Sequence, residues 1–92
     1  MIQSFRDRDA HRLWMGEFVK RYGSIEKQAI RKLDMLHNAS SLNDLRALPA
    51  NRLEALSGDR RGQHSIRIND QWRLCFVWTG SDAHEVEIAD YH

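Results

Sequence analysis

The chain has 92 residues, of which 41% are hydrophobic and 29% are charged, with a formal net charge of +1 at pH 7. This length favours one compact domain, residues 1–92, and the composition excludes a disordered or fibrous protein. The small net charge argues against a protein that coats nucleic acid through bulk electrostatics. No apolar run reaches the roughly 18 residues of a membrane span, and the first residues lack the apolar core of a signal peptide. We therefore expect a cytoplasmic protein with no membrane partner.

The first part of the chain has the apolar spacing of helices. Residues 2–5 can form a short strand, and apolar side chains then recur at helical steps over residues 13–22, where Gly23 interrupts the pattern. A second amphipathic helix is predicted over residues 25–36, with Ser24 as its N-cap. Two helices are therefore expected before the middle of the chain.

One further short helical turn is predicted before the only proline. Ser40 or Ser41 can cap this turn, which continues over residues 42–48 until Pro49 stops it. Pro49 lies between two differently patterned halves of the sequence. We interpret this position as a join between halves of one domain.

The second half of the chain alternates in the manner of strands. Alternation is clear over residues 65–69, 72–78 and 84–88, and short polar connections separate these segments. Residues 53–56 can add a strand at the start. The pattern predicts an antiparallel meander covered by the helices, which is an α+β architecture.

The alternation also predicts which side chains share a face of this sheet. If Trp72 and Leu74 point toward the helices, Arg73 points to the opposite side, and Arg67 does the same when Ile66 points inward. Two arginines would then lie close together on an open surface. Such a surface is more typical of nucleic-acid binding than of a metabolite pocket.

Basic charge is concentrated in one central segment. Every basic residue between positions 52 and 73 is an arginine, and no lysine or arginine follows Leu74. A guanidinium can bind phosphate oxygens through two parallel hydrogen bonds, which an ammonium group does not do. On charge alone, a phosphate-binding surface and a solvated, salt-bridged strand surface remain equally acceptable interpretations.

Residues 51–76, N-R-L-E-A-L-S-G-D-R-R-G-Q-H-S-I-R-I-N-D-Q-W-R-L-C-F, resemble the signature of HigB-type toxins of the RelE superfamily. The opening M-I-Q-S-F, the L-R-A-L-P before the signature and the closing V-E-I-A-D-Y-H extend the resemblance over nearly the whole chain. The resemblance implies a RelE-like fold, with two N-terminal helices packed on a small, twisted and mainly antiparallel sheet.

The resemblance also implies a function. Toxins of this kind belong to type II toxin–antitoxin systems, enter the ribosomal A site and cleave messenger RNA there, which inhibits translation. The implied partners are messenger RNA, 16S ribosomal RNA and a HigA-like antitoxin with a helix-turn-helix fold. In such a cleavage the 2′-hydroxyl of the RNA is the nucleophile, so the protein supplies proton transfer and charge stabilisation without a metal or cofactor.

Four residues are the catalytic candidates that the resemblance implies. Asp90 and His92 can exchange protons, and which of the two is the base stays open. Tyr91 can stack on a base or donate a hydrogen bond. Arg73 can neutralise the charge that develops on the phosphate.

Four more residues are candidates for RNA binding. Arg60, Arg67 and Gln71 can orient the message or hold ribosomal RNA phosphates. Glu54 is a departure, because some relatives have histidine there, and Ser57 replaces a lysine of some relatives. A carboxylate at Glu54 can act as a base or orient an arginine.

Three alternatives have weaker support. The five histidines have no close pairing and only one cysteine beside them, which argues against a zinc site. A non-nuclease toxin that acts on DNA gyrase, like the ParE toxins, would share this fold, and the D-Y-H ending with Arg73 favours the nuclease. A plain RNA-binding module fits the small net charge and the few aromatic residues poorly.

Overall fold

The protein is described by a computed structural model over residues 1–90. Its first half contains α1 (Arg8–Trp14), the 3₁₀ helix η1 (Lys20–Ile25), α2 (Glu26–Asn38), α3 (Leu42–Arg46) and the 3₁₀ turn η2 (Pro49–Asn51). Its second half contains β1 (Glu54–Ala55), the 3₁₀ turn η3 (Gly58–Arg60), β2 (His64–Arg67), β3 (Trp72–Thr79) and β4 (Asp82–Asp90).

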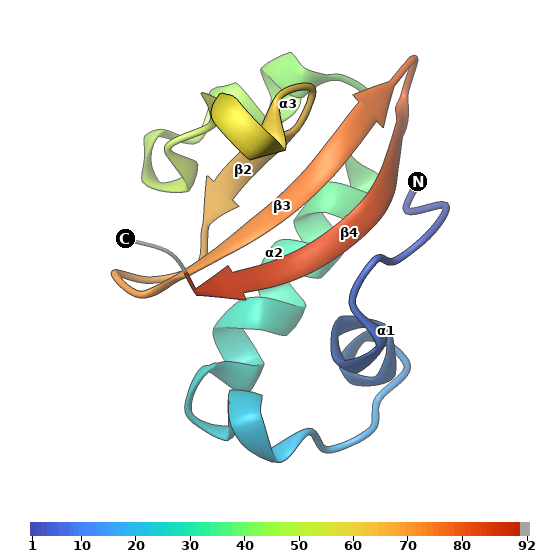
Figure 1. Cartoon of the computed structure of the whole chain (residues 1–92), viewed down its shortest axis with the longest axis vertical. Helices are drawn as coiled ribbons and strands as arrows, with labels where there is room; N and C mark the ends of the chain where they lie inside the picture. The colour runs from blue at the N-terminus through green and yellow to red at the C-terminus, as the bar shows by residue number, and fades with distance from the viewer. Residues whose placement is uncertain (91–92) are drawn as a thin grey trace.

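The four strands form one sheet in the order β1-β2-β3-β4, and each pair of neighbours is antiparallel. Helices α1 and α2 pack on one face of this sheet, with α2 running behind β3 and β4 in Figure 1. This arrangement confirms the predicted α+β class, and the strand predicted over residues 53–56 is present as the two-residue strand β1. No helix within residues 1–90 is long and apolar enough to cross a membrane.

Helix α2 supplies the apolar stripe that was predicted from its spacing. Ile25, Ala29, Leu33 and Leu36 are all buried, and they belong to the same apolar cluster as inward-facing residues of the strands. Ser24 is not the N-cap, because it lies within η1 and the N-cap position is Ile25, which makes no side-chain capping bond. The following short helix α3 is capped as predicted, since the Ser41 hydroxyl accepts from the Asp44 N–H at 3.4 Å.

The first predicted helix is wrong in extent. Helix α1 ends at Trp14 instead of continuing to residue 22, and Gly16 follows with φ of +91°. Glycine adopts this left-handed conformation without steric cost, whereas a residue with a Cβ atom would be strained in it. Gly16 can therefore end the helix at this position. Phe18, which the helical pattern placed on the apolar face, is 67% exposed. Gly16, and not Gly23, was the stop signal.

Tyr22 connects the irregular segment after α1 to the rest of the core. Its ring is fully buried and meets the Trp72 ring edge-on at 5.5 Å between centroids. Its hydroxyl donates to Asp7 Oδ2 at 2.6 Å, while Asp7 Oδ1 accepts from the Asp9 N–H as the N-cap of α1. Burial, followed by this hydrogen bond, raises the pKa of Tyr22. One phenol therefore fixes both η1 and the start of α1.

Replacing Tyr22 with phenylalanine should lower the free energy of unfolding by about 1–3 kcal/mol, because the buried ring stays while the bond to a charged acceptor is lost. Urea unfolding followed by circular dichroism measures this difference. The matched control is Tyr22→Phe in an Asp7→Ala background, where the further loss should be much smaller. An equal loss in both backgrounds would show that the hydroxyl does not act through Asp7.

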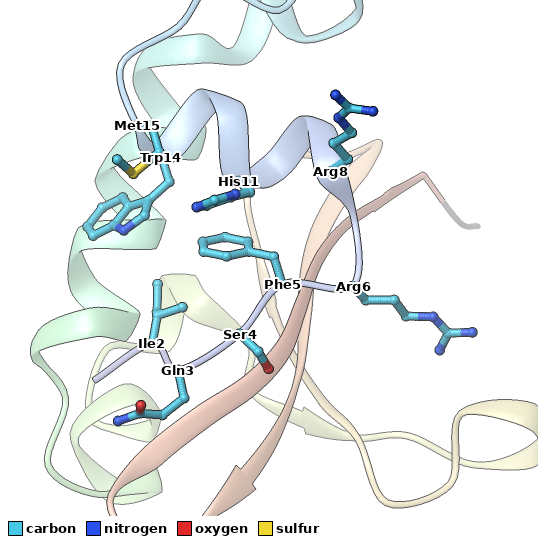
Figure 2. A pocket seen from close by; sticks show the side chains of 9 residues that line it. All are labelled: Ile2, Gln3, Ser4, Phe5, Arg6, Arg8, His11, Trp14 and Met15. Carbon is cyan, nitrogen blue, oxygen red and sulfur yellow. The ribbon is translucent and has the colours of Figure 1, made fainter.

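The N-terminal segment runs along the outer edge of β4. Ile2 and Phe5 form isolated parallel bridges with Ala83 and Val86, so the short strand predicted at residues 2–5 is present only as these two bridges. The sheet is thus mainly antiparallel, as the family resemblance implied. A groove of about 520 Å³ lies between this segment and α1, lined among others by Phe5, His11 and Met15, as Figure 2 shows.

Candidate functional site

The face of the sheet opposite α1 and α2 carries Arg67 and Arg73, the two arginines that the strand alternation predicted there. Residues opposite each other in antiparallel strands place their side chains on the same face. Arg67 of β2 is opposite Arg73 of β3, and Ser65 is opposite Cys75. Cys75 is in turn opposite Glu87 of β4. We call the surface formed by Ser65, Arg67, Arg73, Cys75 and Glu87 the arginine face. The predicted placement of Arg67 and Arg73 on one surface is confirmed.

Arg73 is half-buried and held along one edge of its guanidinium. Its Nε donates to the Ser65 hydroxyl at 2.8 Å. Its Nη2 donates to the carbonyl of Arg52 at 2.6 Å and to the carbonyl of Ser65 at 3.4 Å. Within residues 1–90 Nη1 makes no hydrogen bond, so two N–H donors of a fixed cation remain for a ligand.

Arg67 has a different environment, at the hairpin between β2 and β3. Its Nη2 forms an i,i+3 ion pair with Asp70, whose side chain is 99% exposed. The hydrogen bond from Arg67, with its charge, lowers the pKa of Asp70. Solvent screens an exposed pair of this kind, so it contributes little to stability. A phosphate group can therefore replace Asp70 at Arg67 at small cost.

Arg60 reaches the arginine face from η3, the yellow turn that lies in front of β2 in Figure 1. Its Nη1 contacts Glu87 at 2.8 Å and Gln63 at 3.1 Å, and the Arg60 and Glu87 side chains are only 30% and 24% exposed. This pair covers Cys75, which is fully buried and whose thiol pKa is raised by that burial. Through its bond to Glu87, Arg60 holds residues 57–62 against the sheet. The sequence did not indicate this structural contact.

The two candidate carboxylates lie on different sides of the sheet. Glu54 is exposed and opposite Ser65, so it borders the arginine face near Arg73. Asp90 is opposite Trp72, whose side chain faces the helices, so strand alternation places its carboxylate on the helix side at the end of the sheet. Asp90 accepts there from Gln71 Nε2 at 3.0 Å.

Three contributors to this site were missed by the sequence reasoning: Ser65, Glu87 and the carbonyl of Arg52. Ser65 had a usable signal, because it alternates with Ile66 and so had to share the face of Arg67. The Arg52 carbonyl had none, since its direction depends on a left-handed backbone conformation with φ of 44°. The predicted catalytic residues Tyr91 and His92 lie outside the described residues.

Metal binding is not indicated by this geometry. Among the described residues, 1–90, no group of three histidine, cysteine or carboxylate side chains lies close enough to hold a metal ion. His64, at the helix side of β2, is half-buried beside the Phe76 ring, and burial lowers its pKa.

Comparison with known proteins places this chain in a family. A sequence model described as the RelE-like toxin HigB of type II toxin–antitoxin systems matches residues 2–92. Toxin HigB-1 of Vibrio cholerae is 40% identical over 85 residues, which cover 85% of this chain and 84% of that protein. The chain belongs to the HigB family of RelE-like toxins. A shorter match joins 45% of the chain to a protein named endoribonuclease HigB from Proteus vulgaris, at 39% identity over 41 residues.

Solved structures show that the fold of this HigB family member is shared more widely. A crystal structure of a YafQ mutant from E. coli is similar at a TM-score of 0.63 and 15% identity, covering 98% of this chain and 91% of that one. The YoeB protein complex with YefM from Staphylococcus aureus contains a similar chain at a TM-score of 0.57 and 19% identity, with 100% and 98% covered. These likenesses confirm the predicted fold. Membership of a type II toxin–antitoxin family also implies an antitoxin as a partner.

Proposed function

We propose that this toxin is a ribosome-dependent endoribonuclease that cleaves messenger RNA in the ribosomal A site. The observation that carries the proposal is the arginine face, where Arg73 is held by three hydrogen bonds and keeps two donors for a phosphate. The name of the Proteus vulgaris relative supports the same activity.

The proposed cleavage uses the RNA itself as nucleophile. A general base removes the proton of the 2′-hydroxyl, and the 2′-oxygen attacks the adjacent phosphorus to form a cyclic phosphate. The bond from phosphorus to the 5′-oxygen breaks, and a general acid protonates that oxygen. Arg73 Nη1 donates to the phosphate oxygens as their negative charge grows. No metal or cofactor takes part in these steps.

The remaining candidates have separate roles in this proposal. Asp90 and His92 exchange the two protons, and Tyr91 stacks on or hydrogen-bonds to the message. Glu54 is a second carboxylate, opposite Ser65 at the border of the arginine face, where it can act as a base or orient an arginine. Arg67, Arg60 and Gln71 orient the message or bind 16S ribosomal RNA, and Arg67 does so by exchanging Asp70 for a phosphate.

The cellular setting follows from the same proposal. An enzyme that cuts message on ribosomes acts in the cytoplasm, as one domain over residues 1–92, and stops growth when it is free. We propose that its antitoxin is HigA-like, with a helix-turn-helix fold that also binds DNA.

Purified protein should leave naked message intact and cut it on programmed ribosomes. The physical reason is that the acid–base candidates lack the paired histidines with which free ribonucleases commonly work, so the ribosome has to orient the reacting phosphate. Toeprinting of one defined message, with and without ribosomes, measures this difference. Efficient cutting of naked RNA at the same protein concentration would contradict the proposal. A DNA gyrase supercoiling assay is the control, and inhibition there would favour the ParE-like alternative.

A further inference from the structure

We propose that Ser65, with the backbone carbonyl of Arg52, positions Arg73 so that only the Nη1 edge of its guanidinium faces the RNA. Ser65 is then a positioning residue, since it contacts Arg73 and not the substrate. This inference rests on the proposed function.

The hydrogen bonds occupy one edge of the guanidinium, the edge formed by Nε and Nη2. Nε donates to the Ser65 hydroxyl at 2.8 Å, and Nη2 donates to the carbonyls of Arg52 and Ser65 at 2.6 and 3.4 Å. These acceptors use the three N–H groups of Nε and Nη2, so the guanidinium plane cannot turn without breaking them. Ser65 is itself fully buried, which fixes the position of its hydroxyl.

The second acceptor is built by an unusual backbone conformation. Arg52 has φ of 44° and ψ of 55°, in the left-handed region that residues other than glycine rarely adopt. Such a conformation costs on the order of 1–3 kcal/mol and persists only where neighbours impose it. It directs the Arg52 carbonyl at Arg73. A strained residue whose carbonyl binds the proposed catalytic cation supports a positioning role.

The residue before Arg52 is anchored from the core side. Asn51 is fully buried, donates to the Leu45 carbonyl at 3.0 Å and accepts from Lys32 Nζ at 2.6 Å. Its backbone N–H also donates to the Leu48 carbonyl at 2.9 Å. The turn that presents the Arg52 carbonyl is therefore held in place by α2 and α3. Because Arg73 bonds to this carbonyl, its guanidinium is held in place as well.

Arg67 is the natural comparison, because it lies opposite Arg73 on the same face. Its guanidinium bonds only to the exposed Asp70 among described residues, so it is free to change orientation. Rigid donors stabilise a developing charge without reorganising, and mobile donors have to be ordered first. The difference in support explains why Arg73, and not Arg67, suits the reacting phosphate.

The experiment is a double-mutant cycle in single-turnover cleavage on ribosomes. Ser65→Ala should reduce the rate about tenfold, the usual size of losing one bond to a charged group. Ribosome affinity should not change, because the Ser65 side chain lies fully buried beneath Arg73 and is not accessible to the RNA. In the Arg73→Ala background, Ser65→Ala should have no further effect. Full activity of Ser65→Ala, or a loss that persists without Arg73, would overturn the proposal.

A matched control separates positioning from general destabilisation. The Ser4 hydroxyl accepts from the Glu85 N–H at 2.9 Å, at the other edge of the sheet and far along the chain from Arg73. Ser4→Ala loses a comparable bond and should cut at the wild-type rate.

Nuclear magnetic resonance tests the geometry without any activity. The Nε–H of Arg73 should exchange slowly with water in the wild type and rapidly in Ser65→Ala. Rapid exchange in the wild type would overturn the positioning role, even if Ser65→Ala failed to fold. If wild-type protein did not cut message on ribosomes, the proposed function would fail, and slow Nε–H exchange would still show that Ser65 holds Arg73.

Discussion

Changing His92 to glutamine, or deleting it, is expected to slow single-turnover cleavage on the ribosome by about a hundredfold or more, the range typical of losing a general acid or base. The expectation rests on the D-Y-H ending that the chain shares with HigB-type toxins. Ribosome binding should survive, because the phosphate contacts come from the arginine face. The mutant should therefore compete with wild type for the A site and still bind its antitoxin.

The pH dependence identifies the role of the ring. If His92 transfers a proton and chemistry is the slow step, the mutant's pH–rate profile should lose one limb. His84→Gln is the matched control, since His84 is a half-buried histidine of β4 with no proposed part in the reaction. A deletion that cuts at the wild-type rate with an unchanged profile would remove His92 from the mechanism. Asp90→Asn should also reduce the rate.

Arg73→Ala is expected to slow single-turnover cleavage by a similar factor, on the order of a hundredfold or more, because the transition state loses one preorganised charged donor. The structure adds a second consequence. The Ser65 hydroxyl and the Arg52 carbonyl lose their donor, so a small fall in melting temperature should accompany the loss of rate. Circular dichroism and toeprinting on the same sample measure both effects.

Arg67→Ala is the control for Arg73→Ala, because it removes equal charge from the opposite position on the arginine face. Its effect should fall mainly on ribosome or message binding, and the rate at saturation should change little. A well-folded Arg73→Ala mutant with nearly normal cleavage would move the charge role to Arg67 or Arg60.

The sequence predicted the sheet better than the helices, for physical reasons. Strand alternation depends only on neighbouring residues, so the shared face of Arg67 and Arg73 could be derived from the pattern. The first helix could not, because its end depends on Gly16 adopting a left-handed conformation that the apolar spacing conceals. Phe18, for example, fits the apolar spacing of a helix, but its side chain is exposed in the structure.

The site was predictable only in part. Residue type and alternation identify Arg73 as a cation on the open face. The three hydrogen bonds that hold it go to Ser65 on the neighbouring strand β2 and to the carbonyl of Arg52 in the turn before β1. The Arg60–Glu87 pair joins residues 27 positions apart, so no local sequence pattern could predict it. The side of the sheet on which the Asp90 carboxylate lies follows from its register opposite Trp72, which the sequence alone did not indicate.

The N-terminal segment on β4 has a consequence for how this toxin associates with other chains. An uncovered edge strand offers a row of unpaired backbone groups on which a foreign strand can extend the sheet. Residues 2–5 occupy part of that row on β4, and the Val86 N–H and carbonyl bond to Ser4 and Arg6. At the opposite edge β1 is only two residues long. The described residues therefore leave no long uncovered strand edge, which hinders self-aggregation by sheet extension.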